Sequence, residues 1–146
     1  MSQTPPPQFD PERLFAMRSM GHGTQLGIGY RAHGADWVDL TLPWRADLVG
    51  NAGTMILASG PILTLMDMAT AISVWLKRGT WAPQATLDLR IDYLRAARPG
   101  ETVIGHGECY RTTRSIAFVR GYAHDGDAND PIAHVAGTFM LLDTTA

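Results

Sequence analysis

Cysteine is almost absent from this chain of 146 residues, which carries only Cys109. A single cysteine excludes an internal disulfide, and this usage fits a reducing, cytoplasmic compartment. Cys109 falls inside an expected strand, where a packed thiol is favoured over a nucleophile. The five histidines are scattered, and no spacing typical of metal ligands occurs. The sequence therefore predicts no metal and no other cofactor.

An excess of charge of one sign is also lacking, because 12 basic residues face 14 acidic ones and the net charge is −2. This balance gives no general attraction to nucleic acid or to a membrane surface. The hydrophobic share of 45% excludes a disordered chain. The first residues have neither a basic start nor an apolar run, so no signal peptide is expected. We predict an extended or disordered segment over residues 1–8 and one domain over residues 9–146.

Residues 58–79 are the most informative stretch, because a helix over these residues would be apolar almost all the way round. Ser59 or Gly60 suits an N-cap, Pro61 the first helical position and Gly79 a left-handed stop. A helix that is apolar all round is expected in a protein core, and this one is too short and too interrupted to span a membrane. Its one central carboxylate, Asp67, needs a partner, a proton or a function.

The remaining segments predict an α+β fold. A short helix is expected over residues 10–20, and a polar turn joins two strands at 24–31 and 37–44. Residues 45–57 read as a loop, and His22 as a loop residue between glycines. Four further strands are expected at 84–94, 101–111, 115–123 and 132–142, as a meander of antiparallel neighbours. In the first of them Leu87, Leu89, Ile91 and Tyr93 alternate with Thr86, Asp88, Arg90 and Asp92. One antiparallel sheet curled around one buried helix is the economical arrangement.

Three motifs carry a family resemblance: Leu65-Met-Asp-Met-Ala69, Ala85-Thr-Leu-Asp-Leu-Arg-Ile-Asp-Tyr-Leu94 and Ala97-Arg-Pro-Gly100. They resemble the hotdog-fold acyl-CoA thioesterases, and most closely the phenylacetate-pathway type within the 4-hydroxybenzoyl-CoA thioesterase superfamily. The resemblance covers roughly residues 45–142. It implies a long helix inside a curved sheet, subunits that pair their sheets in a homodimer or homotetramer, and active sites at the interface.

The resemblance also implies site residues. Asp67 matches the catalytic carboxylate of the helix, and Thr86 matches a hydroxyl residue that positions water. Asn51 matches the asparagine of the preceding loop only loosely, because the loop is about one residue too long. Where the family has His-Gly-Gly before the helix, this chain has Ala58, Ser59 and Gly60, which keep the backbone N–H groups for an oxyanion.

The predicted activity is hydrolysis of an acyl-CoA thioester, with Asp67 activating water or attacking the carbonyl directly. Residues at strand ends and turns are candidate contacts for the CoA phosphates: Arg95, Arg98, Arg111, Arg114 and Ser115. The alternative is an acyl-CoA-binding or regulatory hotdog protein without turnover, because the family histidine is missing. No nucleic-acid or membrane partner is expected.

Overall fold

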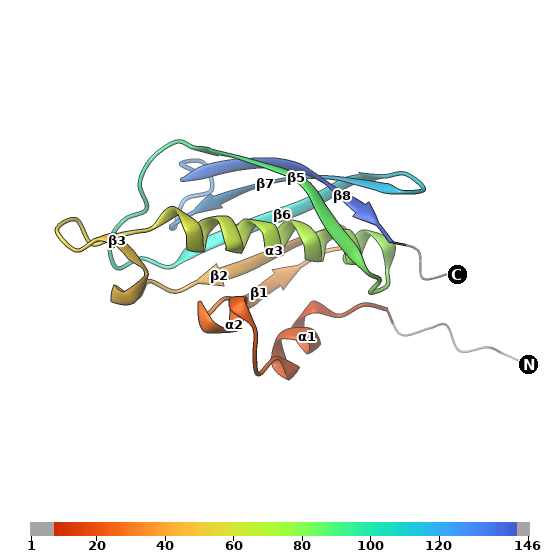
Figure 1. Ribbon diagram of the computed structural model, residues 1–146, viewed down its shortest axis with the longest axis horizontal. Coiled ribbons are helices and arrows are strands. Elements are labelled where there is room, and N and C mark those ends of the chain that lie inside the picture. Colours follow the sequence, from red (N-terminus) through yellow and green to blue (C-terminus); the bar gives the residue numbers. More distant parts are fainter. Residues whose placement is uncertain (1–7, 143–146) are drawn as a thin grey trace, which may run out of the picture.

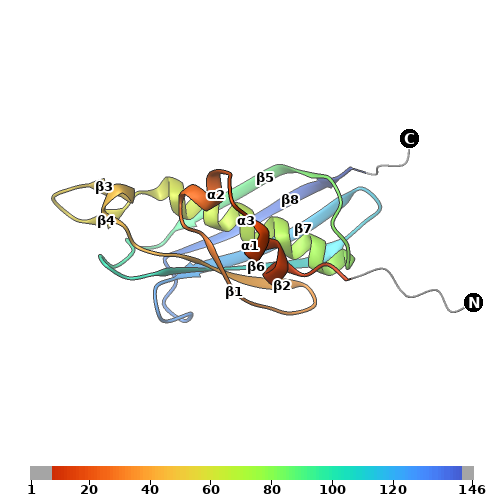
Figure 2. The ribbon, with the colours of Figure 1, turned by 90° about the horizontal axis from the view of Figure 1, so that it is seen from below.

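The computed structural model describes residues 8–142, so most of the N-terminal segment predicted to be extended lies outside the described residues. A long helix, α3, crosses the middle of the domain, with strands behind it and two short helices on its other side (Figures 1 and 2). The helices in chain order are α1 (Pro11–Met17), α2 (His22–Gln25), the 3-10 turn η1 (Ala46–Leu48) and α3 (Ser59–Arg78). The strands are β1 (Gly29–His33), β2 (Trp37–Leu42), β3 (Val49–Asn51), β4 (Ile56–Leu57), β5 (Gln84–Tyr93), β6 (Val103–Thr112), β7 (Ile116–His124) and β8 (Ala133–Leu141).

Six strands form one antiparallel sheet in the order β1-β2-β6-β7-β8-β5. The predicted hairpin of β1 and β2 is confirmed, and β6, β7 and β8 follow one another as a meander. The position of β5 corrects the predicted four-strand meander. After β5 the chain crosses over to β6, which lies between β2 and β7 in the sheet. Strand β5 itself pairs with β8 at the edge of the sheet. The curved sheet around one long helix is the hotdog fold, as predicted.

Helix α3 begins earlier than the sequence signals suggest. Its N-cap is Ala58, which is extended and makes no side-chain cap, so Ser59 and Gly60 lie inside the first turn rather than before it. Pro61 is tolerated there because the N–H groups of a first turn have no intrahelical partner. The predicted stop is confirmed, since Gly79 takes the left-handed conformation with φ 72°.

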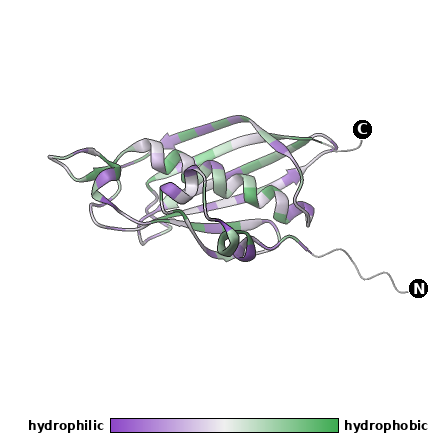
Figure 3. Cartoon of the chain, turned by 60° about the horizontal axis from the view of Figure 1, so that its bottom comes forward, coloured by the Kyte–Doolittle hydropathy of each residue, from purple (hydrophilic) through white to green (hydrophobic). Residues whose placement is uncertain are grey.

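One side of α3 is pressed against the sheet, and its core side chains include Leu65, Met66 and Ala69, all fully buried. Gly107 of β6 permits this contact, because a Cβ there would lie 2.4 Å from the backbone of Ala69. By length and composition alone α3 would qualify to cross a bilayer, which corrects the argument that it is too short. Its packing on the sheet makes it the core helix of this fold, and Figure 3 shows its apolar residues among those of the strands.

The N-terminal third differs from the sequence prediction in three places. The first helix ends at Met17 instead of residue 20, although Asp10 caps it as expected by accepting from the N–H of Glu12 at 2.9 Å. His22 opens the one-turn helix α2, where a loop and then a strand were predicted. The expected loop before α3 contains η1 and a small hairpin of β3 and β4.

Candidate active site

The carboxylate of Asp67 is half-buried on α3 and points toward β5. The hydroxyl of Thr86 donates a hydrogen bond of 2.9 Å to Asp67 Oδ1. The same bond fixes the carboxylate on one side and leaves Oδ2 without a hydrogen bond from any described residue. The structure therefore brings together two of the predicted catalytic residues, which lie 19 positions apart in the sequence.

A bulge in β5 aims Thr86 at the helix. The pairing with β8 skips Leu87, so Thr86 lies opposite Phe139 while Asp88 lies opposite Thr138. One extra residue in a strand reverses the alternation on either side of it. Thr86 therefore shares the helix-facing side with Leu89, whereas simple alternation had placed it with Asp88. Leu87, which simple alternation had placed on one face with Leu89 and Ile91, is 51% exposed.

An open cleft of about 380 Å³ surrounds the carboxylate. It is lined by His22, Leu63, Thr64, Asp67, Thr86 and Leu89. Three separate segments thus supply its walls: α2 on one side, β5 on the other and α3 as the floor. The N-terminal segment, which was assigned no part in the site, contributes an imidazole.

His22 is placed in the cleft by the glycines on both sides of it. Gly21 has φ 105°, a conformation that residues with a side chain rarely adopt. Gly23 is buried against α3, and a Cβ there would lie 2.4 Å from the Met68 sulfur. The ring then reaches α3, where His22 Nε2 and Thr64 Oγ1 are 3.2 Å apart. The spacing Gly-His-Gly was the sequence signal for this residue, and it was read only as a helix end.

The other predicted catalytic groups lie farther along the molecule. Ser59 and Gly60 open α3, so their N–H groups are eight and seven residues, or about 10 to 12 Å, from Asp67 along the helix. Asn51 ends β3, and its side-chain oxygen accepts from the N–H of Gly53 at 2.8 Å in a tight turn. The structure does not bring these three residues together with Asp67 within one chain.

A second, apolar pocket adjoins the same face of α3. It has a volume of about 240 Å³ and is lined by Leu14, Arg18, Met68, Ala71, Ile72 and Trp75. Met68 directly follows Asp67, and Ala71 lies one turn beyond it, so the pocket continues the cleft toward the C-terminal half of α3. The short helix α1 forms its outer wall.

The predicted phosphate-binding arginines do not form one cluster. Arg95 and Arg98 lie in the loop after β5, whereas Arg111 and Arg114 lie at the far end of β6, a strand about 30 Å long. Ser115 is exposed in the turn between β6 and β7. Arg111 and Arg114 are also exposed, and with Ser115 they stay candidate CoA contacts.

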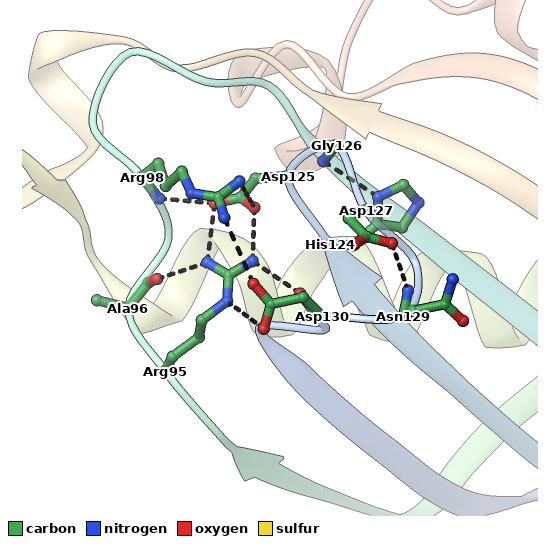
Figure 4. Close-up of polar contacts among 9 residues, drawn as sticks. All are labelled: Arg95, Ala96, Arg98, His124, Asp125, Gly126, Asp127, Asn129 and Asp130. Carbon is green, nitrogen blue, oxygen red and sulfur yellow. Dashed lines mark hydrogen bonds and ion pairs between the residues drawn. The ribbon is translucent and has the colours of Figure 1, made fainter.

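Arg95 is engaged inside the protein. Its guanidinium donates to both oxygens of Asp125, at 2.6 and 3.0 Å, and to the carbonyl of Asp130 (Figure 4). The N–H of Arg98 adds a bond of 2.7 Å to Asp125. The Arg95 guanidinium holds the pKa of the buried Asp125 carboxyl down at about 2. Arg95 thus joins the loop after β5 to the turn before β8, while the Arg98 side chain is 55% exposed.

Comparisons with known proteins bear on what this arrangement does. The family model described as the thioesterase superfamily matches residues 56–132, more than half of the chain. The chain belongs to the thioesterase superfamily. Asp67 and Thr86 both lie inside the matched segment. No curated protein sequence gives a significant match.

Solved structures share the fold of this chain. A protein from Pseudomonas aeruginosa is 39% identical, with a TM-score of 0.78, and the match covers 90% of this chain and 96% of that one. A thioesterase from Haemophilus influenzae shares the fold at 21% identity, with a TM-score of 0.82 and 94% of each chain covered. The PaaI protein from the phenylacetic acid degradation operon of Escherichia coli shares it at 16% identity, with a TM-score of 0.71 and 83% of each chain covered.

Proposed function

We propose that this thioesterase-superfamily protein hydrolyses acyl-CoA thioesters with Asp67 as the general base. The observation that carries the proposal is the carboxylate held by Thr86 in an open cleft, with Oδ2 available to a water molecule. Asp67 takes a proton from water, and the water oxygen adds to the thioester carbonyl. When the tetrahedral intermediate collapses, the carbon–sulfur bond breaks, and the CoA thiolate leaves and takes up a proton.

Thr86 acts as a positioning residue in this scheme. Its hydroxyl proton is directed at Asp67 Oδ1, so it orients the carboxylate and does not itself activate water. Direct attack of Asp67 on the carbonyl is the other route open to the same carboxylate.

The oxyanion site is proposed to come from a second copy of the chain. The free N–H groups of Ser59 and Gly60 at the start of α3 suit a developing negative charge. Their distance of about 10 to 12 Å from Asp67 of the same helix is too long for one carbonyl carbon to meet both. Two copies with their α3 helices side by side and antiparallel would bring the start of one helix to the carboxylate of the other.

The apolar pocket is proposed to hold the acyl group. It lies one to two helical turns beyond Asp67 along α3, at Ala71 and Trp75. A cavity of about 150 Å³ is enough for a benzene ring, so a pocket of about 240 Å³ fits an aryl or medium-chain acyl group.

The CoA portion of the bound substrate then extends toward the start of α3. Arg98 is exposed near the start of α3, so it is a nearer candidate for a phosphate contact than Arg111 or Arg114. We propose that the enzyme is cytoplasmic.

Substitution of Asp67 by asparagine tests the proposal, because it keeps the shape of the side chain and removes its charge. We expect the wild type to release free thiol from a panel of acyl-CoAs, and Asp67→Asn to lower kcat by about 100-fold or more with KM little changed. Asp92→Asn, an exposed carboxylate at the other end of β5, is the control. No thiol release from the wild type, together with tight acyl-CoA binding, would favour the non-catalytic alternative.

A further inference from the structure

We infer that His22 contacts the substrate and donates a hydrogen bond to the thioester carbonyl oxygen as negative charge develops on it. The inference rests on the proposed function and adds a residue from the N-terminal segment. It starts from the position of the ring: His22 lines the same cleft as Asp67 and Thr86, and α2 has no other polar side chain in that cleft.

The hydrogen bonds around Thr64 indicate which atom of the ring carries the proton. The Thr64 hydroxyl donates to the Gly60 carbonyl at 3.2 Å, as a threonine in a helix commonly does. A hydroxyl has one proton, so its oxygen accepts from the imidazole at the other contact of 3.2 Å. On this basis we place the proton of the ring on Nε2, with its N–H pointing to the floor of the cleft.

A carbonyl oxygen that enters the cleft competes with Thr64 for this N–H. An oxyanion is a much stronger acceptor than a neutral hydroxyl, so the bond strengthens as the tetrahedral intermediate forms. Only an interaction that is stronger in the transition state accelerates the reaction. The neutral ring suffices for this role, because the donor is an N–H and no proton needs to be transferred.

The glycines on both sides of His22 indicate that the position of its ring is built into the local backbone and is not an accidental contact. Gly21 takes a backbone conformation of φ 105°, and Gly23 lets α2 approach Met68 more closely than any side chain would allow. Both features serve to bring one residue, the imidazole between them, to the surface of α3.

Two substitutions of His22 separate donation from packing. His22→Leu removes the N–H and should lower kcat by about 100-fold or more, with KM changed little. His22→Gln places an amide N–H near the position of Nε2 and should keep kcat within about tenfold of the wild type. His134→Leu, on an exposed position of β8, is the matched control and should leave kcat unchanged. Thermal unfolding of all three variants should stay close to that of the wild type.

A binding measurement makes the test independent of turnover. Calorimetry with an acyl-CoA analogue in which a tetrahedral, anionic phosphonate replaces the thioester carbonyl should show about tenfold weaker binding for His22→Leu and near-normal binding for His22→Gln. Equal kcat and equal analogue binding in His22→Leu and the wild type would overturn the inference while leaving Asp67 in its role. A loss of kcat and of analogue binding that His22→Gln fails to restore would also overturn it.

Discussion

Among the carboxylates of the described residues, Asp125 has the most clearly lowered pKa. Its side chain is fully buried and contacts the guanidinium groups of Arg95 and Arg98. The hydrogen bonds from Arg95 lower its pKa to about 2, from an ordinary value of 3.8. A carboxylate with a depressed pKa in the folded state stabilises the fold above its unfolded-state pKa and loses that contribution as the pH falls.

We therefore predict that acid weakens the protein between about pH 4 and pH 2, by on the order of 2 kcal/mol from this group. Asp125→Asn should lower the free energy of unfolding at pH 7 by about 3 kcal/mol, because two guanidinium groups lose their buried partner. It should also remove this part of the acid dependence. Urea unfolding at several pH values measures both effects.

Asp92→Asn is the control for this prediction. Asp92 pairs with Arg90 on exposed side chains, so its substitution should change stability by less than about 1 kcal/mol. If Asp125→Asn kept the acid sensitivity of the wild type, the ion pairs of Asp125 would not be its source.

At the scale of elements, α3 carries both the carboxylate and the floor of the apolar pocket. Ala71 lies one turn past Asp67 and lines that pocket between α1 and α3. We predict that Ala71→Leu lowers kcat/KM for phenylacetyl-CoA and octanoyl-CoA by about 10-fold to 100-fold, because the new side chain occupies acyl space. Acetyl-CoA, which does not reach the pocket, should change by less than about threefold in the same thiol-release assay.

Ala16→Leu gives a matched substitution on the exposed side of α1, outside the pocket, and should leave the preference among acyl groups unchanged. An equal loss for all three substrates would place the acyl group elsewhere, since a blocked pocket discriminates by acyl length.

Elements with strong periodicity were predictable from the sequence, whereas features that depend on neighbours were not. Val38, Leu40 and Leu42 alternate and are fully buried in β2, as the pattern predicts. The bulge at Leu87 has no local signal, because it is defined by the pairing of β5 with β8. The position of β5 at the sheet edge likewise depends on its pairing with β8, which is distant in the sequence. The order of the strands along the chain had suggested a simple meander.

The residues of the candidate site also differ in how far the sequence predicted them. Asp67 stands out in the sequence as one carboxylate in an apolar helix, and the family resemblance pairs it with Thr86. His22 does not stand out, because a helix of one turn has little intrinsic signal and depends on tertiary contacts for its stability. Its contact with Thr64 spans 42 positions of the chain and follows from the packing of Gly23 on Met68.

At the scale of the whole molecule, the β5 edge of the sheet is open. The sheet order ends at β5, and three apolar side chains at or next to this strand are exposed: Leu87 at 51%, Tyr93 at 44% and Leu94 at 57%. An unpaired edge strand is a template for pairing with another chain. Antiparallel pairing of two β5 strands would join the sheets of two copies and place their α3 helices side by side, as the proposed shared site requires.

The shared site predicts that two inactive variants complement each other. Ser59→Pro removes one N–H at the start of α3 without disturbing the helix, because proline is favoured at the first helical position and Ala58 is already extended. We expect Ser59→Pro and Asp67→Asn each to lose most of their kcat. When the two are unfolded together and refolded, half of the dimers are mixed, and each mixed dimer has one intact site, which restores about a quarter of the wild-type activity. Ser59→Ala keeps the N–H and should remain active. A mixture no more active than either variant alone, or a monomer by light scattering at micromolar concentration, would mean that each chain works with a site of its own.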